Sequence, residues 1–438
     1  MPDNHSIPAP MRLIYTWLLR LSMPFILMRL WWRGRRAPAY RERWRERLGV
    51  VPARRGRAKL VWLHSVSVGE TLAAVPLIRA LRSRNPDWQW LVTTTTPTGS
   101  ERVRDAFREQ LGRNMLHYYA PYDLPECLRR FTTQLRPDLL VVMETELWPN
   151  LLRHCDRRQV PALLANARLS EKSARGYARI GGITREMLQS LDRVVAQYQD
   201  DGDRFIRLGL PPERLSISGN IKFDLEIPAG LRSEALALAD RWRGGSKRPL
   251  VLAASTHAGE EEQVLDAFAK VLEERENALL ILVPRHPERF GPVAELCRKR
   301  GYDVCRRSEG IPPKPEQQVL LGDTMGELLK FFGASDIAFV GGSLVPVGGH
   351  NMIEPAAWGV PVICGNHLHN FARVSEMMQR DGAMAVVEDA DALAEKILWL
   401  LSDDNLRQKV GRRALEVAEA NRGALQRLIH EVEALAAR

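Results

Sequence analysis

Short apolar segments alternate with helical segments along most of the chain, and this alternation restricts the fold more than any other feature. One run begins with LVWLH at Leu60–His64, and a second begins with LVLAAST at Leu250. Both are apolar on both faces, as in parallel strands buried between two layers of helices. Helical crossovers between parallel strands give a doubly wound sheet. The sequence therefore predicts the α/β class, with two doubly wound domains.

The alternation breaks between Gly219 and Gly245, and this break separates the two predicted domains. The expected parts are an anchor with basic residues over 1–45, a first domain over 46–225, a second over 226–415 and a last helix over 416–438. Packing of this last helix back on the first domain is one alternative. We expect the cores to begin at Lys59 and ligands to bind beyond the strand ends, in a cleft between the domains.

Residues Met11–Trp32 read MRLIYTWLLRLSMPFILMRLWW, which is long enough to span a bilayer at about 1.5 Å per residue. Arg20 would be costly at the bilayer centre, whereas Arg12 and Arg29 lie near the ends and can reach water. We expect attachment to a membrane. A spanning helix and an interfacial helix remain alternatives, and a helix packed on the protein's own surface is a third.

The net charge of +10 comes from the N-terminal region. Residues 11–60 hold fourteen Lys or Arg and two Glu, so this segment alone carries +12. Such a segment attracts anionic lipids, and the positive-inside rule places the following domains in the cytoplasm. Because the excess is local, a nucleic-acid partner is not indicated. The five cysteines form no C-x-x-C pair, so we expect reduced thiols and no zinc site.

The strongest ligand-binding motif is FVGGSLVPVGGHNMIEP at Phe339–Pro355. Its two glycine pairs would let backbone N–H groups approach a phosphate, and a helix expected to open at Asn351 would attract one. A capping box between Asn351 and Glu354 is a structural alternative that can coexist with binding.

Other polar residues follow predicted strands. In the second domain, LVPRHPERF supplies cations suited to a phosphate or carboxylate, and ASTHAGEE and GDTMGEL are weaker candidates. In the first domain, Glu70 of HSVSVGE is a general-base candidate, with stabilisation by a helix dipole as the alternative. The two D-x-D triplets, Asp201–Asp203 and Asp389–Asp391, are interpreted as helix starts instead of metal sites.

Taken together, these motifs resemble the 3-deoxy-D-manno-octulosonic acid (Kdo) transferases of Gram-negative bacteria. The motifs that carry the resemblance are HSVSVGE, TTTTPTGSERV, METELWPN, NARLSEKSARGY, GNIKFD, ASTHAGEE, VPRHPERF, GDTMGEL and VGGSLVPVGGHNMIEPA. The resemblance implies the glycosyltransferase type B fold, with two Rossmann-like domains. It also implies transfer of Kdo from CMP-Kdo to a lipid A precursor, lipid IVA, at the cytoplasmic face of the inner membrane, without a metal or other cofactor.

The resemblance implies residue roles as well. Glu70 matches the general base of an inverting displacement, and Lys222 with either Glu144 or Glu146 matches transition-state support. The expected donor-binding residues are Ser255, Thr256, Pro284, Arg285, His286, Met325, Gly326, Glu327, Gly348, Gly349, Asn351, Met352, Ile353 and Glu354. Among these, Glu354 is expected to hold the ribose hydroxyls. The alternatives are a type B glycosyltransferase that uses a UDP-sugar and a non-enzymatic lipid-binding scaffold.

Overall fold

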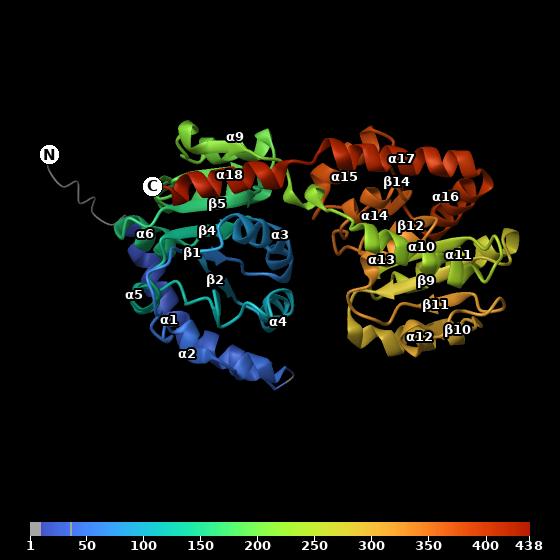
Figure 1. Ribbon diagram of the computed structural model, residues 1–438, viewed down its shortest axis with the longest axis horizontal. Helices are drawn as coiled ribbons and strands as arrows, with labels where there is room; N and C mark the ends of the chain where they lie inside the picture. The colour runs from blue at the N-terminus through green and yellow to red at the C-terminus, as the bar shows by residue number, and fades with distance from the viewer. Residues whose placement is uncertain (1–9, 36) are drawn as a thin grey trace. The chain divides into compact units, whose positions relative to one another are not determined.

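The computed structural model describes residues 10–35 and 37–438 and divides into two compact units (Figure 1). Unit 1 comprises Met1–Asp224 together with Arg422–Arg438, and unit 2 comprises Leu225–Asn421. Each unit contains one seven-stranded, fully parallel sheet. The predicted pair of doubly wound α/β domains is confirmed.

The sheet of unit 1 has the strand order β3-β2-β1-β4-β5-β6-β7. Its strands are β1 Leu60–His64, β2 Gln89–Thr94, β3 Met115–Tyr119, β4 Leu139–Met143, β5 Ala162–Ala167, β6 Arg193–Ala196 and β7 Leu215–Ile217. The sequence pattern missed β3 and β7. Both are edge strands whose side chains are only partly buried, so neither reads as an apolar run.

Helices cover both faces of this sheet. One face carries α3 Val68–Arg84, α4 Pro97–Ala106 and α18 Ala424–Ala436. The other carries α5 Pro125–Leu135, α6 Pro149–Arg157, α7 Glu171–Arg179, α8 Gly181–Gln189 and α9 Gln199–Arg207. Val51 is part of the core on this second face, so the expectation that the cores begin at Lys59 is wrong.

The C-terminal helix α18 lies in unit 1, although it follows unit 2 in the chain. Leu428 and Val432 are fully buried against the sheet, and Glu433 forms an ion pair with Arg84 at 2.8 Å. The Asp224 carboxylate accepts hydrogen bonds from the backbone N–H of Gly423 at 2.6 Å and of Leu425 at 2.8 Å. This carboxylate therefore ties the start of α18 to the last residue of the first segment.

Unit 2 has the strand order β10-β11-β9-β8-β12-β13-β14. The strands are β8 Leu250–Thr256, β9 Leu279–Pro284, β10 Val304–Arg306, β11 Val319–Leu321, β12 Ile337–Val340, β13 Val362–Gly365 and β14 Met384–Val387. Again the pattern missed a short edge strand, β10, in which only one of three residues is buried.

The helices of unit 2 also lie on both faces of its sheet. Helices α10 Ala229–Arg243 and α13 Leu328–Ala334 cover one face, where Trp242 and Phe331 are buried. Helices α11 Glu261–Glu274, α12 Phe290–Lys299 and α16 Ala390–Ser402 cover the other. The remaining helices are α14 Ile353–Trp358, α15 Ala372–Arg380 and α17 Asp404–Ala420.

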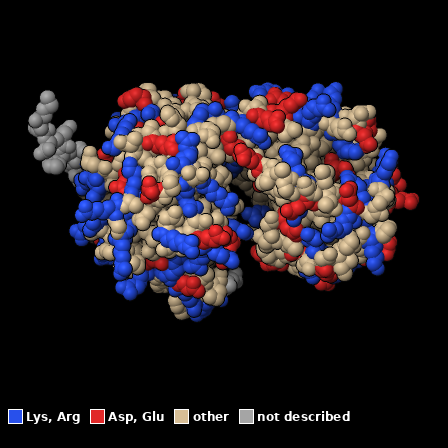
Figure 2. Space-filling view, viewed as in Figure 1, with Lys and Arg blue, Asp and Glu red and all other residues tan. Residues whose placement is uncertain are grey.

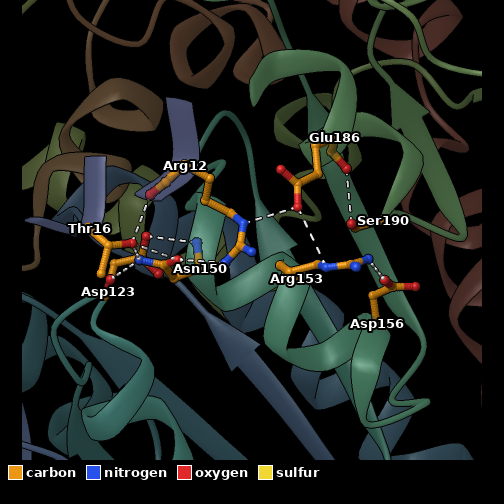
Figure 3. Close-up of polar contacts among 8 residues, drawn as sticks. All are labelled: Arg12, Thr16, Asp123, Asn150, Arg153, Asp156, Glu186 and Ser190. Carbon is orange, nitrogen blue, oxygen red and sulfur yellow. Dashed lines mark hydrogen bonds and ion pairs between the residues drawn. The ribbon is translucent and has the colours of Figure 1, made fainter. Parts of the chain in front are cut away.

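The N-terminal helix α1, Pro10–Arg33, is long and apolar enough to cross a membrane, but one side of it packs on unit 1 through polar contacts (Figure 3). Arg12 forms an ion pair with Glu186 of α8 at 3.0 Å, and Thr16 hydrogen-bonds the side chain of Asn150 on α6 at 3.2 Å. Arg20 pairs with Glu126 of α5 at 3.0 Å. The expectation that Arg12 reaches water from the helix end is wrong, because its guanidinium is buried in this network.

Candidate functional residues in the two units

Two strained residues mark the carboxyl edge of the sheet in unit 1. Glu144 follows β4 directly and has φ of 54°, and Asn166 near the end of β5 has φ of 51°. The β5–β6 register also shifts between Leu164 and Ala167. Left-handed backbone is uncommon for residues other than glycine, and such strain gathers at functional sites. The two strained residues and the β-bulge therefore indicate that this edge of the sheet holds the functional site.

Glu70 lies in the first turn of α3, the helix that follows β1. Its carboxylate accepts hydrogen bonds from the Val66 N–H at 2.7 Å and from the Ser67 hydroxyl at 2.7 Å, and only 7% of the residue is exposed. Burial raises the pKa of the Glu70 carboxyl, these hydrogen bonds lower it in part, and the charge of Glu144 raises it further. A carboxylate with a raised pKa is suited to accept a proton.

The structural alternative for Glu70, stabilisation by the helix dipole, is compatible with its position in the first turn of α3, and Glu70 also takes part in a cap. The Ser67 side chain caps α3 by accepting from the Glu70 N–H at 3.2 Å, and the Glu70 side chain reaches back toward the preceding turn. Capping thus fixes the position of the carboxylate and does not exclude a role in proton transfer.

Glu144 and Lys222 lie together in unit 1. Glu144 is buried, and its carboxylate accepts a hydrogen bond from the Arg168 guanidinium at 2.8 Å. The Lys222 ammonium lies 3.7 Å from its other oxygen. Lys222 comes from the segment Ile221–Asp224 after β7, so residues far apart in sequence meet at one anionic centre.

Glu146 has a different environment. Its carboxylate accepts a hydrogen bond from the Trp148 indole at 3.0 Å. Burial raises the pKa of Glu146, and the charges of Glu70 and Glu144 raise it further. All three glutamates are therefore close enough to interact electrostatically, but only Glu144 forms a described ion pair with Lys222.

In unit 2 the predicted donor-binding residues lie at the ends of β8 and β9 and in the segments that follow β11, β9 and β12, including the start of α14. Strands β11, β9, β8 and β12 are consecutive neighbours in the sheet. Ser255, near the end of β8, has φ of 58°, and the β8–β9 register shifts between Ala254 and Thr256. The Arg285 N–H donates to the Thr256 carbonyl at 3.0 Å, which joins the first two loops. As in unit 1, a bulge and a strained residue mark the carboxyl edge of the sheet.

Glu260, whose role was not predicted from the sequence, organises the glycine-rich loop. Its fully buried carboxylate accepts backbone N–H hydrogen bonds from Gly342 at 2.7 Å, from Ser343 and Leu344 at 2.9 Å each, and from His257 at 3.2 Å. The signal was present in ASTHAGEE, where an acid follows a glycine directly after a buried strand.

The glycines after β12 shape this loop. A Cβ atom at Gly341 would lie 2.7 Å from a Glu260 carboxylate oxygen, so a larger residue does not fit. The N–H groups of Gly348 and Gly349 donate to the Gly342 carbonyl at 3.1 and 2.7 Å. These two N–H groups are therefore already used within the loop, and a contact of Gly348 and Gly349 with the donor stays a prediction.

The expected capping box differs in detail. Helix α14 begins at Ile353 instead of Asn351. The Asn351 side chain accepts from the Ile353 N–H at 3.2 Å and donates to the Glu354 carboxylate at 2.9 Å. Asn351 thus forms a local turn and orients Glu354, while the side chains of Met352 and Ile353 are buried in the core and leave only their backbone for a ligand.

The two arginines that follow β9, Arg285 and Arg289, differ in their contacts. Arg289 binds the buried Glu261 through two hydrogen bonds, at 3.0 and 2.9 Å, and so has a structural role. Within residues 10–35 and 37–438, the Arg285 guanidinium forms no ion pair. His286 is exposed, and Pro284 ends β9 as a buried residue. Arg285 is thus the cation of this loop that is open to an anion.

In the loop after β11, the backbone is more available to a ligand than the charged side chain, because Glu327 is already engaged. The Glu327 carboxylate is held by Arg307 at 2.8 Å and by the Thr324 hydroxyl at 2.7 Å. Met325 is half exposed, and Gly326 has φ of 85°. This turn can present its backbone and the Met325 side chain to a base or ribose.

The D-x-D triplets lie at helix starts, as predicted. Asp201, in α9, accepts from the Leu169 N–H at 2.8 Å, and Asp389 caps α16 by accepting from the Ala392 N–H at 2.9 Å. Among the residues that the structure describes, no group of three His, Cys, Asp or Glu side chains is arranged to hold a metal ion. The expectation of metal-free chemistry stays a prediction.

Comparisons with known proteins agree with this architecture. Residues 42–225 match the family described as 3-Deoxy-D-manno-octulosonic-acid transferase (kdotransferase), and residues 257–417 match Glycosyl transferases group 1. A glycosyltransferase from Rickettsia africae covers 87% of this chain and 98% of its own, with a TM-score of 0.57 and 14% identity. This likeness shows the type B glycosyltransferase fold alone, and the fold prediction is confirmed.

Curated relatives show the family. The 3-deoxy-D-manno-octulosonic acid transferase of Haemophilus influenzae is 43% identical over 95% of this chain and 97% of its own length. The protein of that name from Bordetella pertussis is 36% identical over 96% of this chain and 98% of its own. The chain therefore belongs to the 3-deoxy-D-manno-octulosonic acid (Kdo) transferases, a family of glycosyltransferase enzymes.

Proposed function

We propose that this enzyme transfers Kdo from CMP-Kdo to the lipid A precursor lipid IVA during lipopolysaccharide synthesis. The family supports a Kdo transfer reaction. The observation that carries the mechanism is the group formed by Glu70, Glu144 and Lys222 at the carboxyl edge of the sheet in unit 1. It combines a carboxylate suited to accept a proton with an oriented ion pair.

In the proposed reaction, Glu70 takes the proton from the acceptor hydroxyl as its oxygen attacks the anomeric carbon of Kdo. The new C–O bond forms while the bond from this carbon to the CMP phosphate oxygen breaks, so the configuration inverts. The electron pair leaves with CMP. Because CMP is already a good leaving group, no strong general acid is needed, and charge stabilisation suffices.

We assign transition-state support to Glu144 together with Lys222. The 3.7 Å ion pair and the hydrogen bond from Arg168 hold the Glu144 carboxylate in place. A fixed charge pair stabilises developing charge without reorganising during the reaction. Glu146 has no described contact with Lys222, so we place it in the surrounding carboxylate group only.

In this proposal unit 2 binds the nucleotide of the donor. Arg285 meets the phosphate, the turn at Met325 and Gly326 contacts the base or ribose, and Glu354 holds the ribose hydroxyls. The open guanidinium of Arg285 supports the first role. The hydrogen bond from Asn351, which orients Glu354, supports the last. No metal ion or other cofactor enters the proposed reaction.

Purified protein incubated with CMP-Kdo and the tetraacylated precursor tests the proposal, with mass spectrometry counting the sugars added. We expect CMP release and a product that is heavier by one or more Kdo units. A parallel reaction with UDP-sugars should give no product. Transfer from a UDP-sugar without transfer from CMP-Kdo would reject the proposed donor.

We also propose that α1 attaches the enzyme to the inner membrane as an interfacial helix, with the catalytic units in the cytoplasm. The side of α1 opposite to its polar contacts exposes large apolar residues, including Leu18 at 61%, Leu21 at 69% and Phe25 at 67%. A spanning helix would place Arg12, Thr16 and their partners in hydrocarbon. Helix α1 packs its polar side on unit 1 and exposes an apolar side opposite to it. This arrangement is suited to a helix that lies in the membrane–water interface.

The charges near α1 support this arrangement. Figure 2 shows Lys and Arg side chains gathered over the part of unit 1 that carries α1 and α2 Trp44–Arg47. Exposed cations in this part are Arg29, Arg33, Arg35, Arg41 and Arg45. Such side chains interact with anionic headgroups beside the apolar face.

Replacing Leu18, Leu21 and Phe25 together by Gln is expected to lower the affinity for anionic vesicles by about 10–100-fold, because three apolar side chains lose partial burial in lipid. Vesicle sedimentation measures this affinity. Leu236→Gln, at an exposed apolar residue of unit 2, is the control and should bind like the wild type. Unchanged sedimentation of the triple variant would reject this face of α1 as the attachment surface.

A further inference from the structure

Three histidines converge at the carboxyl edge of the sheet in unit 2, and two of them, His257 and His350, have no role in the proposed reaction. His257 follows β8, His286 follows β9 and His350 belongs to the loop after β12. The ring centroids of His257 and His286 are 5.4 Å apart, and the Nε2 atoms of His257 and His350 are 2.7 Å apart. Three separate loops therefore contribute imidazoles to one place.

The contact between His257 and His350 is a hydrogen bond between ring ends. The two ring planes differ by only 7°, and the centroids are 5.0 Å apart. With the Nε2 atoms 2.7 Å apart, this geometry is that of rings joined end to end in a common plane. One Nε2 must carry hydrogen and the other must accept it, so at least one ring nitrogen holds a proton that points at its partner.

The surroundings of this pair favour its neutral state. Burial lowers the pKa of His257, and the nearby charges of His286, Arg285 and Arg289 lower it further. Burial also lowers the pKa of His350 to about 3, with further contributions from His257, Arg285 and His286.

Nearby carboxylates are already engaged. Glu260 is held by four backbone N–H groups, and Glu261 is held by the Arg289 guanidinium. The Arg285 guanidinium has no such partner among the described residues. The charges that face the histidine pair are therefore mainly positive, and a bound anion would reverse their effect.

We infer that His257 and His350 form a proton-sharing pair that contacts the phosphate of the donor nucleotide and gains one proton when this oxyanion binds. This inference rests on the proposal that unit 2 binds CMP-Kdo. The proton comes from solvent and forms an N–H bond at the free Nδ1 of the ring that donates through Nε2. It returns to solvent when the nucleotide leaves.

Linkage gives the sign of the expected pH dependence. If the anion raises the proton affinity of the pair, then affinity for the anion must rise as the pH falls. For each pKa unit by which the bound anion raises the pKa of the histidine pair, the affinity for the anion at low pH exceeds the affinity at high pH by about tenfold. The ligand for this measurement must not titrate itself, and the second pKa of a phosphate monoester, about 6, excludes CMP.

The probe is therefore cytidine 5′-(methyl phosphate), a phosphodiester with one fixed negative charge, and cytidine serves as the uncharged reference. Calorimetry on the full-length protein between about pH 5.5 and 8, a range that contains the ordinary pKa of histidine, gives each affinity. Wild-type protein should bind the diester about tenfold more tightly at the low end of this range, with proton uptake seen in buffers of different ionisation enthalpy. Cytidine should bind with constant affinity.

His350→Gln and His257→Gln should each bind the diester with an affinity that no longer depends on pH. His430→Gln, on the exposed side of α18 in unit 1, is the control and should retain the wild-type profile. Constant wild-type affinity for the diester, without proton uptake, would overturn the inference and leave the proposed function standing. If neither diester nor cytidine binds, the proposed donor fails together with the inference.

Discussion

Replacing Glu70 by Gln is expected to lower the rate of Kdo transfer by about 10²–10⁴-fold, the usual range for loss of a general base. The amide keeps the size of the side chain and can still accept the Val66 N–H through its oxygen. It cannot take a proton from the acceptor hydroxyl. A transfer assay with CMP-Kdo measures the rate, and CMP affinity should remain unchanged because unit 2 is untouched.

Ser67→Ala separates the catalytic role of Glu70 from its role in capping. This variant loses the cap of α3 and one hydrogen bond to the Glu70 carboxylate, but keeps the carboxylate itself. We expect a loss of about 0.5–2 kcal/mol in the free energy of unfolding, with most of the transfer activity retained. Near-normal turnover by Glu70→Gln, or equal loss in both variants, would contradict the assignment of Glu70 as the base.

The pH profile of the wild type gives an independent check. Glu70 accepts a proton only when ionised, so the rate should rise with pH as its carboxyl loses a proton. Because burial and the charge of Glu144 raise this pKa, the rise should lie above the ordinary glutamate value of about 4.3. The transfer rate of the Glu70→Gln variant should not show this rise with pH.

Replacing Glu260 by Ala is expected to destabilise unit 2 by about 3–5 kcal/mol, because several buried backbone N–H groups lose their acceptor. The substitution leaves the N–H groups of Gly342, Ser343 and Leu344 buried without an acceptor. Each such group costs about 1–3 kcal/mol unless water enters. Denaturation of the full chain measures the loss, and amide hydrogen exchange of residues 341–344 should accelerate.

The control for this experiment is Glu273→Ala on α11, where the replaced side chain is exposed. It should change the free energy of unfolding by less than about 0.5 kcal/mol. Glu260→Gln offers a second comparison, because its one carbonyl oxygen can satisfy only some of the N–H groups. Wild-type exchange rates at residues 341–344 in Glu260→Ala would show that the carboxylate does not hold the loop.

The sequence was sufficient to predict the two sheets, because their central strands are buried on both faces and read as continuous apolar runs. Strand β1 is an example, with all five residues buried. Edge strands carry less of this signal. Met115–Tyr119 has three partly exposed residues, and Val304–Arg306 has two. Periodicity cannot detect a strand whose burial depends on which neighbours the tertiary fold supplies.

The candidate sites were predicted in the same uneven way. Glu70 and Arg285 follow obvious strands, so their position at the carboxyl edge of a sheet could be predicted. The partners of Glu144 could not, because Lys222 is 78 residues away along the chain and meets it only through the order of strands in the sheet. The buried position of Arg12 was also missed, since its partner Glu186 lies on a helix in the middle of the chain. Side-chain pairing over such distances needs the fold.

The position of α18 has a consequence for synthesis on the ribosome. Unit 2 is one continuous segment, Leu225–Asn421, whereas unit 1 needs Arg422–Arg438 to cover its sheet. Domains generally fold as their residues emerge, so unit 2 can be complete while the older unit still exposes the sheet face that receives Leu428 and Val432. The part of the enzyme that is made first is thus finished last, and a nascent chain that ends before Arg422 would carry an intact second unit and a first unit without α18.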